Sequence, residues 1–554
     1  MYEEMLKDMF PTSRWDIVWA EKPTEAVEKF EDSYFDCILI DYEISSGFTG
    51  RDFLRWIRAE GGEISGTDKH TPIFLFSQYK GEKREGFSAY DVNKFNAEKE
   101  FIYKEDVKGR LSGPGGSTEI REWTQSLFED AMIPRCTPKL ETEYEPLETV
   151  LVHKPTDEIT RVDPDHLEAY LLEEPLHLNT AQQQHRRFLD TLAEAADRPT
   201  ILDTKRLLFE VVRDANEDER REWLSRILLH PEIQRLRRVF ANSKGSSHLT
   251  SMIGSSERAM SPVLEDLLDK LSQMDAEKIT SLMLRGLTIS EVFGDENEDV
   301  QKRDQQVVPP VSNLYFMRDP AFTLGNRVFL SQMYWPVRRR ETSILRLIFN
   351  EHPFFRQAFV EELGERQVDQ IVSVEGGDVM AIKPGVYAIA ESERTDRKAI
   401  EEVARTLLEK GNADRIYQPR IPVKRAFIHL DTVCSLAGPD YCVVHSEATE
   451  AYASTLCWRN SDEPDLLGKD FVSILEEEFG FSRIETSDRQ EQRQDATNVL
   501  MADPETVVAY ERNENTNDDI KDKGLNVAEF KGGELVKGLG GPRCMTMPIR
   551  RGEL

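Results

Sequence analysis

Hydrophobic and polar positions in the first hundred residues alternate between two spacings. Short apolar runs of strand length stand at Trp15–Ala20, Phe35–Ile40, Pro72–Ser77 and Phe101–Lys104. Between them, Pro23–Phe30 and Gly50–Ala59 carry apolar residues at helical spacing. Strands that alternate with helices predict an α/β domain over residues 1–110, built as a doubly wound parallel sheet. Ligands of such domains bind at the carboxyl ends of the strands.

The pattern then changes twice along the chain. Residues 111–140 are rich in glycine and proline and predict a linker, with a helix over Glu119–Ala131. Thr149–Pro155 predicts a new strand, and helical spacing dominates from about 205 to 290. Past Val307, short strands and glycine-rich turns follow, and no internal repeat is visible. We therefore expect residues 141–554 to form an α/β domain with a helical bundle inserted at about 205–290.

Composition and charge exclude several classes of protein. The 554 residues carry a formal net charge of -31, which opposes binding to nucleic acid or to an anionic membrane surface. No apolar run reaches the length of a membrane helix, and the acidic N-terminus is unlike a signal peptide. The six cysteines show neither metal-ligand spacing nor a disulfide framework. These features predict a cytoplasmic protein with free thiols and no metal site.

Polar residues stand at the carboxyl ends of the N-terminal strands, namely Asp41, Ser77 and Lys104. With Phe101, they resemble the phospho-acceptor, switch hydroxyl, phosphate-binding lysine and switch aromatic of response-regulator receiver domains. The receiver's first strand and its Mg²⁺-binding acidic residues are missing, which deprives Asp41 of the metal that phosphoryl transfer needs. The resemblance implies a truncated or degenerate receiver that regulates or docks, with a signalling protein as partner. Either the true start of the protein lies upstream of Met1, or this receiver-like module pairs with another protein without being phosphorylated.

Reactive side chains gather in four short contexts of the second half. These are Asp319 in Asn313–Met333, Glu375 and Asp378 in Val374–Ile382, His429 and Asp431 in Phe427–Val433, and Cys544 in Lys537–Arg550. Each context has a structural alternative. A free cysteine can pack as a small hydrophobe, Asp-Pro often starts a turn, and aspartate beside glycine stabilises loops. The occurrence of all four in one half of the chain favours a shared site.

The combination of cysteine, histidine and carboxylates suits attack on a planar cationic carbon. In a strand-like run, His429 and Asp431 share one face. Carboxylates bind the donor fork of a guanidinium, while a thiolate attacks its carbon and an imidazole protonates the departing amine. The same carboxylates raise the pKa of Cys544, and a bound cation offsets this effect.

The stretch from about Tyr144 to Arg550 resembles arginine deiminase, of the guanidino-group-modifying (pentein) superfamily. The motifs occur in the family's order: LETVLVHKP, NLYFMRDP, RRRET, VEGGDV, ESERT, FIHLDTV, VVAYERNENTN and GGPRCMTMPIR. The resemblance implies a five-bladed α/β propeller with an inserted helical bundle. It assigns the nucleophile to Cys544, the general acid/base to His429, the guanidinium-holding carboxylates to Asp319 and Asp431, and the orientation of His429 to Glu375.

Further residues are implied as substrate contacts. Asn313, Arg394 and one arginine of Arg338–Arg340, with Arg338 preferred, match residues that hold the amino acid's carboxylate and amine, and Asp378 is a further contact. Such arginines favour arginine over agmatine, which has no carboxylate. Leu539 stands where the family often has an arginine in a mobile loop over the site.

The resulting prediction is hydrolysis of L-arginine to L-citrulline and ammonia through a thiouronium on Cys544, without metal or organic cofactor. The resemblance also implies a homo-oligomer. Three alternatives stay open. They are hydrolysis of another guanidino compound, transfer of the amidino group to an amine, and non-catalytic sensing of arginine.

Overall fold

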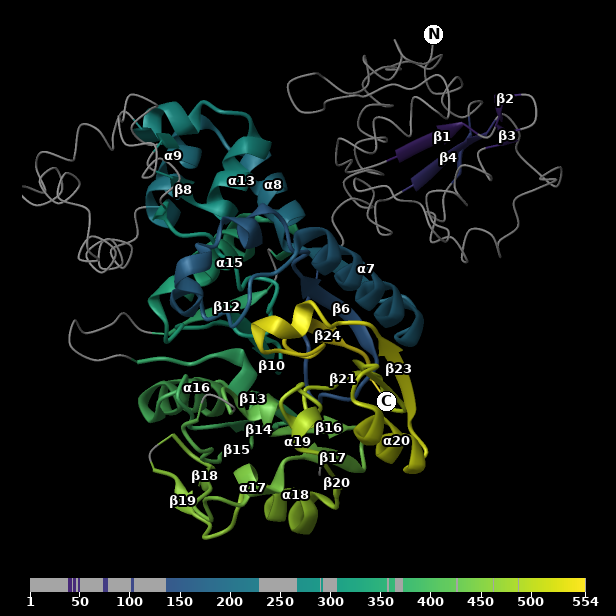
Figure 1. Cartoon of the computed structure of the whole chain (residues 1–554), viewed down its shortest axis with the longest axis vertical. Coiled ribbons are helices and arrows are strands. Elements are labelled where there is room, and N and C mark those ends of the chain that lie inside the picture. The colour runs from purple at the N-terminus through teal and green to yellow at the C-terminus, as the bar shows by residue number, and fades with distance from the viewer. Residues whose placement is uncertain are drawn as a thin grey trace, which may run out of the picture. The chain divides into compact units, whose positions relative to one another are not determined.

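The computed structural model describes residues 38–41, 43–45, 48–49, 73–77, 101–103, 136–228, 267–288, 290–291, 306–355, 358–363, 372–424, 427–461, 463–486 and 488–553. The chain divides into two compact units, Met1–Arg135 and Cys136–Leu554, and each is described by itself (Figure 1). The division lies inside the range that the sequence predicts as a linker.

Unit 1 contains a parallel sheet. Its strands are β1 (Ile38–Asp41), β4 (Ile73–Ser77) and β5 (Phe101–Tyr103), in that spatial order. The predicted parallel pairing is confirmed for these three strands, and Asp41 and Ser77 are the last residues of their strands. A hairpin of β2 (Glu43–Ser45) and β3 (Phe48–Thr49) was not predicted. The predicted strand at 15–20, the helices at 23–30, 50–59 and 119–131, and Lys104 lie outside the described residues.

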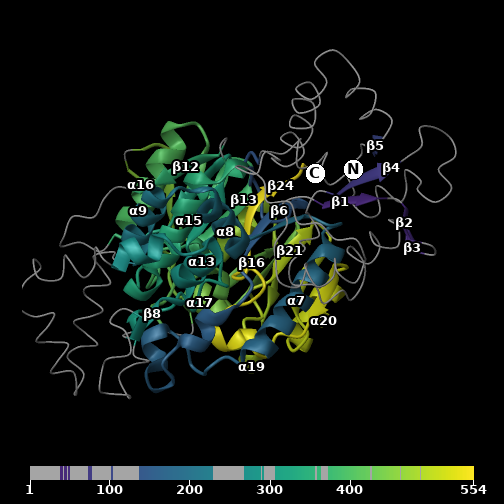
Figure 2. The ribbon, with the colours of Figure 1, turned by 90° about the horizontal axis from the view of Figure 1, so that it is seen from above.

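Unit 2 contains five sheets that share one pairing pattern (Figures 1 and 2). In each, an antiparallel pair of strands is joined by a third strand that runs parallel to the second strand of the pair, and in four of these sheets the pair is a hairpin. The sheets are β10 (Ala321–Leu324), β11 (Arg327–Leu330), β12 (Phe359–Glu362); β13 (Val379–Lys383), β14 (Val386–Ile389), β15 (Arg415–Gln418); β16 (Cys434–Ala437), β17 (Tyr441–Val444), β20 (Ser482–Glu485); β21 (Leu500–Asp503), β22 (Thr506–Tyr510), β23 (Asn526–Phe530); and β24 (Met547–Arg551), β6 (Leu147–Val152), β7 (Thr200–Asp203). The fifth sheet joins the two ends of the unit, because the last strand pairs with the first.

Three of the hairpins turn at a glycine. Gly325, Gly385 and Gly438 have φ angles of 56°, 71° and 78°. This left-handed conformation is open to glycine without the steric cost that a side chain brings. The second sheet is extended by β18 (Leu456–Trp458) and β19 (Asp465–Leu466), and β8 (Leu287–Thr288) pairs separately with β9 (Gln306–Val308).

Helices connect the second and third strands of the sheets. In α16 (Arg397–Glu409), Asp396 caps the N-terminus by accepting hydrogen bonds from two backbone N–H groups, and the buried residues repeat at helical spacing. The same kind of connection contains α7 (Leu178–Ala195), α15 (Arg339–Glu351), α17 (Ser446–Thr449), α18 (Phe471–Phe479) and α20 (Glu514–Asp522), whereas α19 (Arg489–Gln492) lies between the third and fourth sheets. Short 3-10 turns are η1 (Asp157–Arg161), η2 (Pro164–Tyr170), η4 (Pro336–Arg338), η5 (Pro353–Phe355), η6 (Gly376–Asp378), η7 (Leu430–Thr432) and η8 (Leu535–Gly538).

The range that the sequence predicts as a helical insertion has helices in its described parts. It contains α8 (Thr204–Asp214), α9 (Glu217–Leu228) and α13 (Ala276–Arg285), while 229–266 lies outside the described residues. These helices pack with α15 around one apolar core. Arg340 of α15 joins the helical insertion to the rest of unit 2. Its guanidinium donates to the backbone carbonyls of Ile227, Met283 and Pro309.

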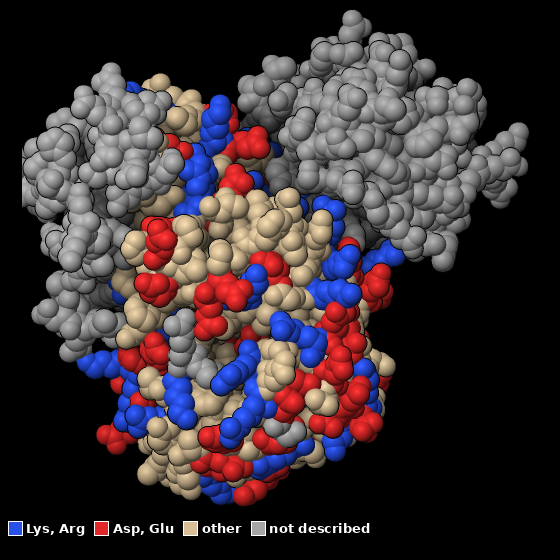
Figure 3. Space-filling model, in the orientation of Figure 1, with Lys and Arg blue, Asp and Glu red and all other residues tan. Residues whose placement is uncertain are grey.

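On the face of unit 2 seen in Figure 3, acidic and basic side chains are interspersed. Among the residues that the structure describes, no helix has the length and apolarity to cross a membrane.

Candidate active site

The predicted site residues occupy equivalent positions in the repeated sheets. Asp319 lies two residues before β10, Glu375 four before β13, and Cys544 three before β24. His429 and Asp431 precede β16 in the same way. All five residues are buried, and each is at most 3% exposed. The segments that enter the first strands of four sheets therefore carry these residues.

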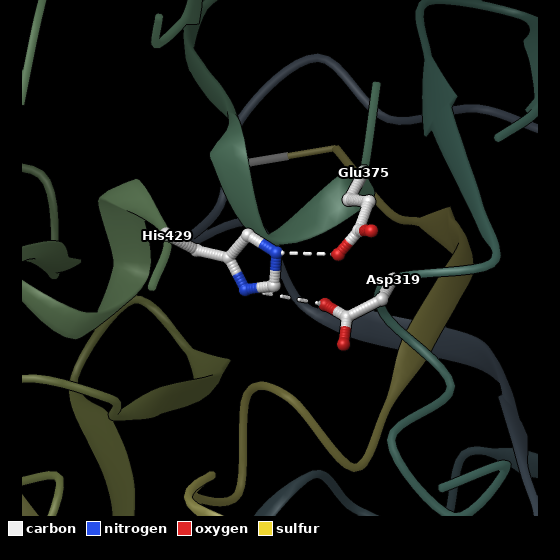
Figure 4. Close-up of side chains that lie close together, drawn as sticks. All are labelled: Asp319, Glu375 and His429. Atoms are coloured by element: carbon white, nitrogen blue, oxygen red, sulfur yellow. Dashed lines mark hydrogen bonds and ion pairs between the residues drawn. The ribbon is translucent and has the colours of Figure 1, made fainter. Parts of the chain in front are cut away.

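His429 lies between two carboxylates (Figure 4). Its Nε2 is 2.8 Å from Oε2 of Glu375, and its Nδ1 is 3.7 Å from Oδ1 of Asp319. Burial alone would lower the pKa of His429, but Asp319 and Glu375 raise it to about 9. Burial would raise the pKa of Glu375, but the hydrogen bond from His429 and the charge of Arg394 lower it. The imidazole is therefore positively charged at neutral pH.

The local structure around His429 differs from the predicted strand. Leu430–Thr432 forms the 3-10 turn η7, so the predicted strand is wrong and His429 and Asp431 do not share a strand face. The turn forms because the hydroxyl of Thr432 donates to the carbonyl of His429 at 2.7 Å. The N–H of Leu430 also donates to Oδ1 of Asp378 at 3.0 Å. His429 consequently contacts Glu375, while Asp431 contacts Cys544.

Cys544 is held inside the tight turn at Pro542–Met545. Its Sγ is 3.5 Å from Oδ2 of Asp431 and 3.0 Å from Nδ2 of Asn498. Its carbonyl accepts a hydrogen bond from the N–H of Arg318, beside Asp319. Burial, and then Asp431 and Asp319, raise the pKa of the thiol well above its usual range. This is the direction expected from the sequence, and it means that the thiol needs a nearby cation to ionise readily.

Two buried arginines each hold one oxygen of the aspartates. Nη1 of Arg338 is 2.6 Å from Oδ2 of Asp319, and Nη1 of Arg543 is 2.8 Å from Oδ2 of Asp431. The Oδ1 atoms of Asp319 and Asp431 are buried and have no hydrogen-bond partner among the described residues. A buried carboxylate oxygen without a donor is costly. These two atoms are therefore suited to accept hydrogen bonds from a cationic ligand.

Two of the predicted substrate contacts, Arg338 and Arg394, lie beside different carboxylates of the site. Of the three consecutive arginines, Arg338 is the one that reaches Asp319, and it also pairs with Glu341. Nη1 of Arg394 lies 3.6 Å from Oε2 of Glu375, and its guanidinium carbon lies 5.8 Å from the ring centre of Trp335. Arg394 thus borders the His429–Glu375 pair.

Asn313 and Asp378 are engaged with the protein itself. Nδ2 of Asn313 donates to the carbonyl of Tyr170 at 2.7 Å. The two oxygens of Asp378 accept from Leu430 and, at 2.6 Å, from the hydroxyl of Ser392. Burial raises the pKa of Asp378 to about 6. In this structure Asp378 therefore supports the turn that carries His429.

The carboxylate–imidazole cluster has the donor atoms of a metal site. Ligand atoms of Asp319, Glu375 and His429 all lie within 4.8 Å of one another. A metal needs the neutral imidazole, however, and the pKa of about 9 keeps His429 protonated at neutral pH. A metal ion at this cluster would therefore have to displace the proton of His429.

Sequence reasoning missed three residues near Cys544. Asn498 precedes β21 and contacts Cys544, and its segment has no motif that singles it out. Arg543, adjacent to Cys544, pairs with Asp431 and also with Glu143 at 3.0 Å. Arg543 was visible inside the glycine-rich run before the cysteine, but its partner Glu143 is about 400 residues away in sequence.

Comparisons with known proteins show relatives that match most of the chain. The family model described as arginine deiminase matches residues 169–551. An arginine deiminase of Staphylococcus aureus is 30% identical over 438 residues, covering 75% of this chain and 98% of the relative. An arginine deiminase of Listeria monocytogenes is 28% identical over 431 residues, covering 74% and 97%.

Solved structures show weaker similarity. An amidinotransferase of saxitoxin biosynthesis from Microseira wollei is 14% identical, covers 76% of this chain and 98% of its own, and has a TM-score of 0.42. At that similarity neither its fold nor its reaction is transferred to this chain. The family match over more than half of the sequence, together with the 30% identity over nearly the whole Staphylococcus aureus relative, shows that this chain belongs to the arginine deiminase family.

Proposed function

We propose that this protein hydrolyses L-arginine to L-citrulline and ammonia, with Cys544 as nucleophile. The observation that carries the proposal is the position of the Cys544 sulfur, 3.5 Å from Asp431, beside two buried carboxylate oxygens without donors. A guanidinium bound to Asp319 and Asp431 would supply those donors. It would also add the positive charge that the thiolate needs.

The reaction proceeds in two steps. As the guanidinium binds, the thiol of Cys544 releases its proton to solvent, and the thiolate attacks the central carbon. The His429 imidazolium donates its proton to the departing nitrogen, ammonia leaves, and an S-alkylthiouronium remains on Cys544. Water then attacks this carbon and gives a proton to the neutral imidazole. The carbon–sulfur bond breaks, and the departing thiolate of Cys544 takes the extra proton of protonated citrulline, which restores the thiol.

Glu375 keeps the histidine oriented and charged for the first step, since it accepts from Nε2 of His429. Arg338, Arg394 and Asn313 are proposed to bind the amino acid's carboxylate and amine. For Arg338 this requires a change of partner, because its guanidinium contacts Asp319 and Glu341 in the structure. Asp378 is proposed as a further substrate contact at the edge of the same site.

Several broader features belong to the proposal. The five sheets with one pairing pattern support the five-bladed propeller, closed by the pairing of β24 with β6. We further propose a cytoplasmic homo-oligomer without metal or organic cofactor, and a receiver-like module in residues 1–110 that regulates or docks. Unchanged arginine kinetics and assembly after deletion of residues 1–135 would count against a regulatory role of that module.

The test is citrulline formation from L-arginine by the full chain, with Cys544→Ala beside it. Agmatine and methylated arginines serve as parallel substrates, and ornithine as an added amine acceptor detects amidino transfer. We expect arginine alone to be hydrolysed and the alanine variant to be inactive. Arginine that binds without reacting would favour the sensor alternative, and hydrolysis of another guanidine would overturn the substrate assignment.

A further inference from the structure

We propose that Asn498 is a catalytic residue, whose side-chain amide donates a hydrogen bond to the sulfur of Cys544 and stabilises its thiolate. The inference deepens the proposed function, because it rests on Cys544 as the nucleophile. Asn498 is completely buried and lies two residues before β21. It belongs to the segment that enters the fourth sheet.

Two hydrogen bonds join Asn498 to the same cysteine. Nδ2 of Asn498 lies 3.0 Å from Sγ of Cys544, and Oδ1 accepts the backbone N–H of Cys544 at 3.0 Å. The amide therefore bridges the main chain and the side chain of Cys544. Such a bridge fixes the side-chain torsion and aims the sulfur, which is how a reacting group is held in productive geometry.

The orientation of the amide follows from chemistry. The backbone N–H of Cys544 can only donate, so it must face the oxygen of the amide and not the nitrogen. The NH₂ group then faces the sulfur and the carbonyl of Asp431, at 3.4 Å. Both of these are acceptors, so the reverse orientation would leave all three contacts unfavourable.

The repeated architecture supports an active role. The segments that enter the first, second, third and fifth sheets contribute Asp319, Glu375, the pair His429 and Asp431, and Cys544. Asn498 occupies the corresponding place in the fourth sheet. All five sheets thus deliver polar groups to one buried centre.

The charges around the sulfur explain what the amide contributes. Asp431 and Asp319 both disfavour the thiolate, and burial adds to their effect. A neutral donor stabilises a thiolate without repelling the guanidinium that must bind next to it. A lysine at this place would compete with the cationic substrate for the aspartates.

Gly541 permits the contact. A Cβ atom on Gly541 would lie 2.7 Å from both the carbonyl and Oδ1 of Asn498, and 2.8 Å from its Cβ. Any side chain at this position would displace the amide. The glycine-rich run before Cys544 therefore serves, in part, to admit Asn498.

The test uses the full chain with Asn498→Ala and with Asn498→Asp, which keeps the shape but lacks the N–H donor. Gly541→Ala is a third variant, which displaces the amide without removing it. Asn517→Ala is the matched control, since Asn517 is buried, donates to the carbonyl of Tyr510 and has no contact with Cys544. Thermal unfolding identifies the variants that fold.

Two readouts are compared across these variants. The first is the rate of alkylation of Cys544 at neutral pH by 2-chloroacetamidine, located by peptide mass mapping, which needs no turnover. The second is kcat and KM for L-arginine. Loss of a hydrogen bond to a charged group predicts alkylation and kcat about 10- to 100-fold lower in Asn498→Ala, with KM changed much less. Asn498→Asp should lose at least as much, because its carboxylate faces the thiolate.

The outcomes separate this proposal from the previous one. If the wild-type chain forms no citrulline but Asn498→Ala still slows alkylation, the proposed function fails and the role of Asn498 stands. If folded Asn498→Ala and Asn498→Asp both match the wild type in alkylation and kcat, the role is overturned. Loss of activity in Gly541→Ala with a fully active Asn498→Ala would also overturn it, because the turn and not the amide would then matter.

Discussion

Nε2 of His429 lies 2.8 Å from Oε2 of Glu375, and each side chain holds the other in its charged form. The pair is buried, with Asp319 on the other ring nitrogen and Arg394 next to Glu375. A histidine in this setting is an acid at neutral pH and becomes a base only after it has given up its proton. This order of events is the one that the proposed reaction requires.

The activity of the protein should decrease at alkaline pH because His429 loses its proton there. His429 must be protonated to donate to the departing nitrogen, and its pKa in the ligand-free protein is about 9, so kcat/KM should fall as pH rises through about 9. Glu375→Gln removes a carboxylate that raises this pKa and should move this alkaline limb to lower pH. Activity against pH, measured for both proteins, checks this. An unshifted limb in Glu375→Gln, relative to the surface control Glu401→Gln, would contradict it.

Stability should depend on pH through the same histidine. Its folded pKa of about 9 exceeds the ordinary value of 6.5, so protonation stabilises the folded state. This contribution is fully present below pH 6.5 and is lost as pH rises through about 9. The difference in the free energy of unfolding between the wild type and His429→Gln, measured by denaturant titration across this window, should shrink as pH rises. A constant difference would show that folding does not raise the pKa of His429.

Leu539 adopts a left-handed backbone conformation, with a φ angle of 64°. A branched Cβ tolerates this conformation worse, so Leu539→Val should lower the free energy of unfolding by about 1–2 kcal/mol. Leu539→Gly is the control, and it should change this quantity by less than about 1 kcal/mol, because glycine relieves the strain but gains entropy when unfolded. Denaturant unfolding of the three proteins measures the effect. Equal stability of the valine variant and the wild type would contradict the prediction.

Arg340 tests the attachment of the helical insertion. Its guanidinium donates to the carbonyls of Ile227 at 3.2 Å, Met283 at 2.5 Å and Pro309, so Arg340→Met should leave all three unpaired. We expect a loss of about 3 kcal/mol or more in the free energy of unfolding, and a KM for arginine close to that of the wild type if the variant folds.

The matched control for this variant is Arg346→Met on the same helix. The Arg346 side chain is 40% exposed and pairs with the exposed Glu362, so its loss should cost less than about 1 kcal/mol. Similar losses in the two variants would refute the anchoring role of Arg340.

Local patterns predicted several elements correctly. The apolar runs around Ile38–Asp41, Ile73–Ser77 and Leu147–Val152 are strands, as predicted. Their apolar residues either alternate with polar ones or form a continuous run, and both patterns are typical of strands in a sheet with buried faces. The helical spacing around α8 and α13 was equally clear. The repeat of five sheets was not visible, because the strands share hydrophobicity and hairpin glycines more than they share residue identities.

Around the site, local sequence patterns also failed to predict contacts of single residues. The 3-10 turn at Leu430–Thr432 depends on Asp378, which is 52 residues away from Leu430 in sequence, and local reading therefore predicted a strand. The sequence did not predict a role for Asn498, because a lone asparagine before a strand is compatible with many ordinary turns.

The sequence by itself determined the types of reactive group, the order of the motifs and the family. Cys544, His429 and the carboxylates stand in short contexts whose chemistry can be read without coordinates. Tertiary structure decided which groups touch. Pairing of His429 with Glu375, of Cys544 with Asp431 and Asn498, and of Arg543 with Glu143 joins segments 46 to 400 residues apart. Only burial of these groups in one low-dielectric centre makes their charges interact strongly enough to set the pKa of each.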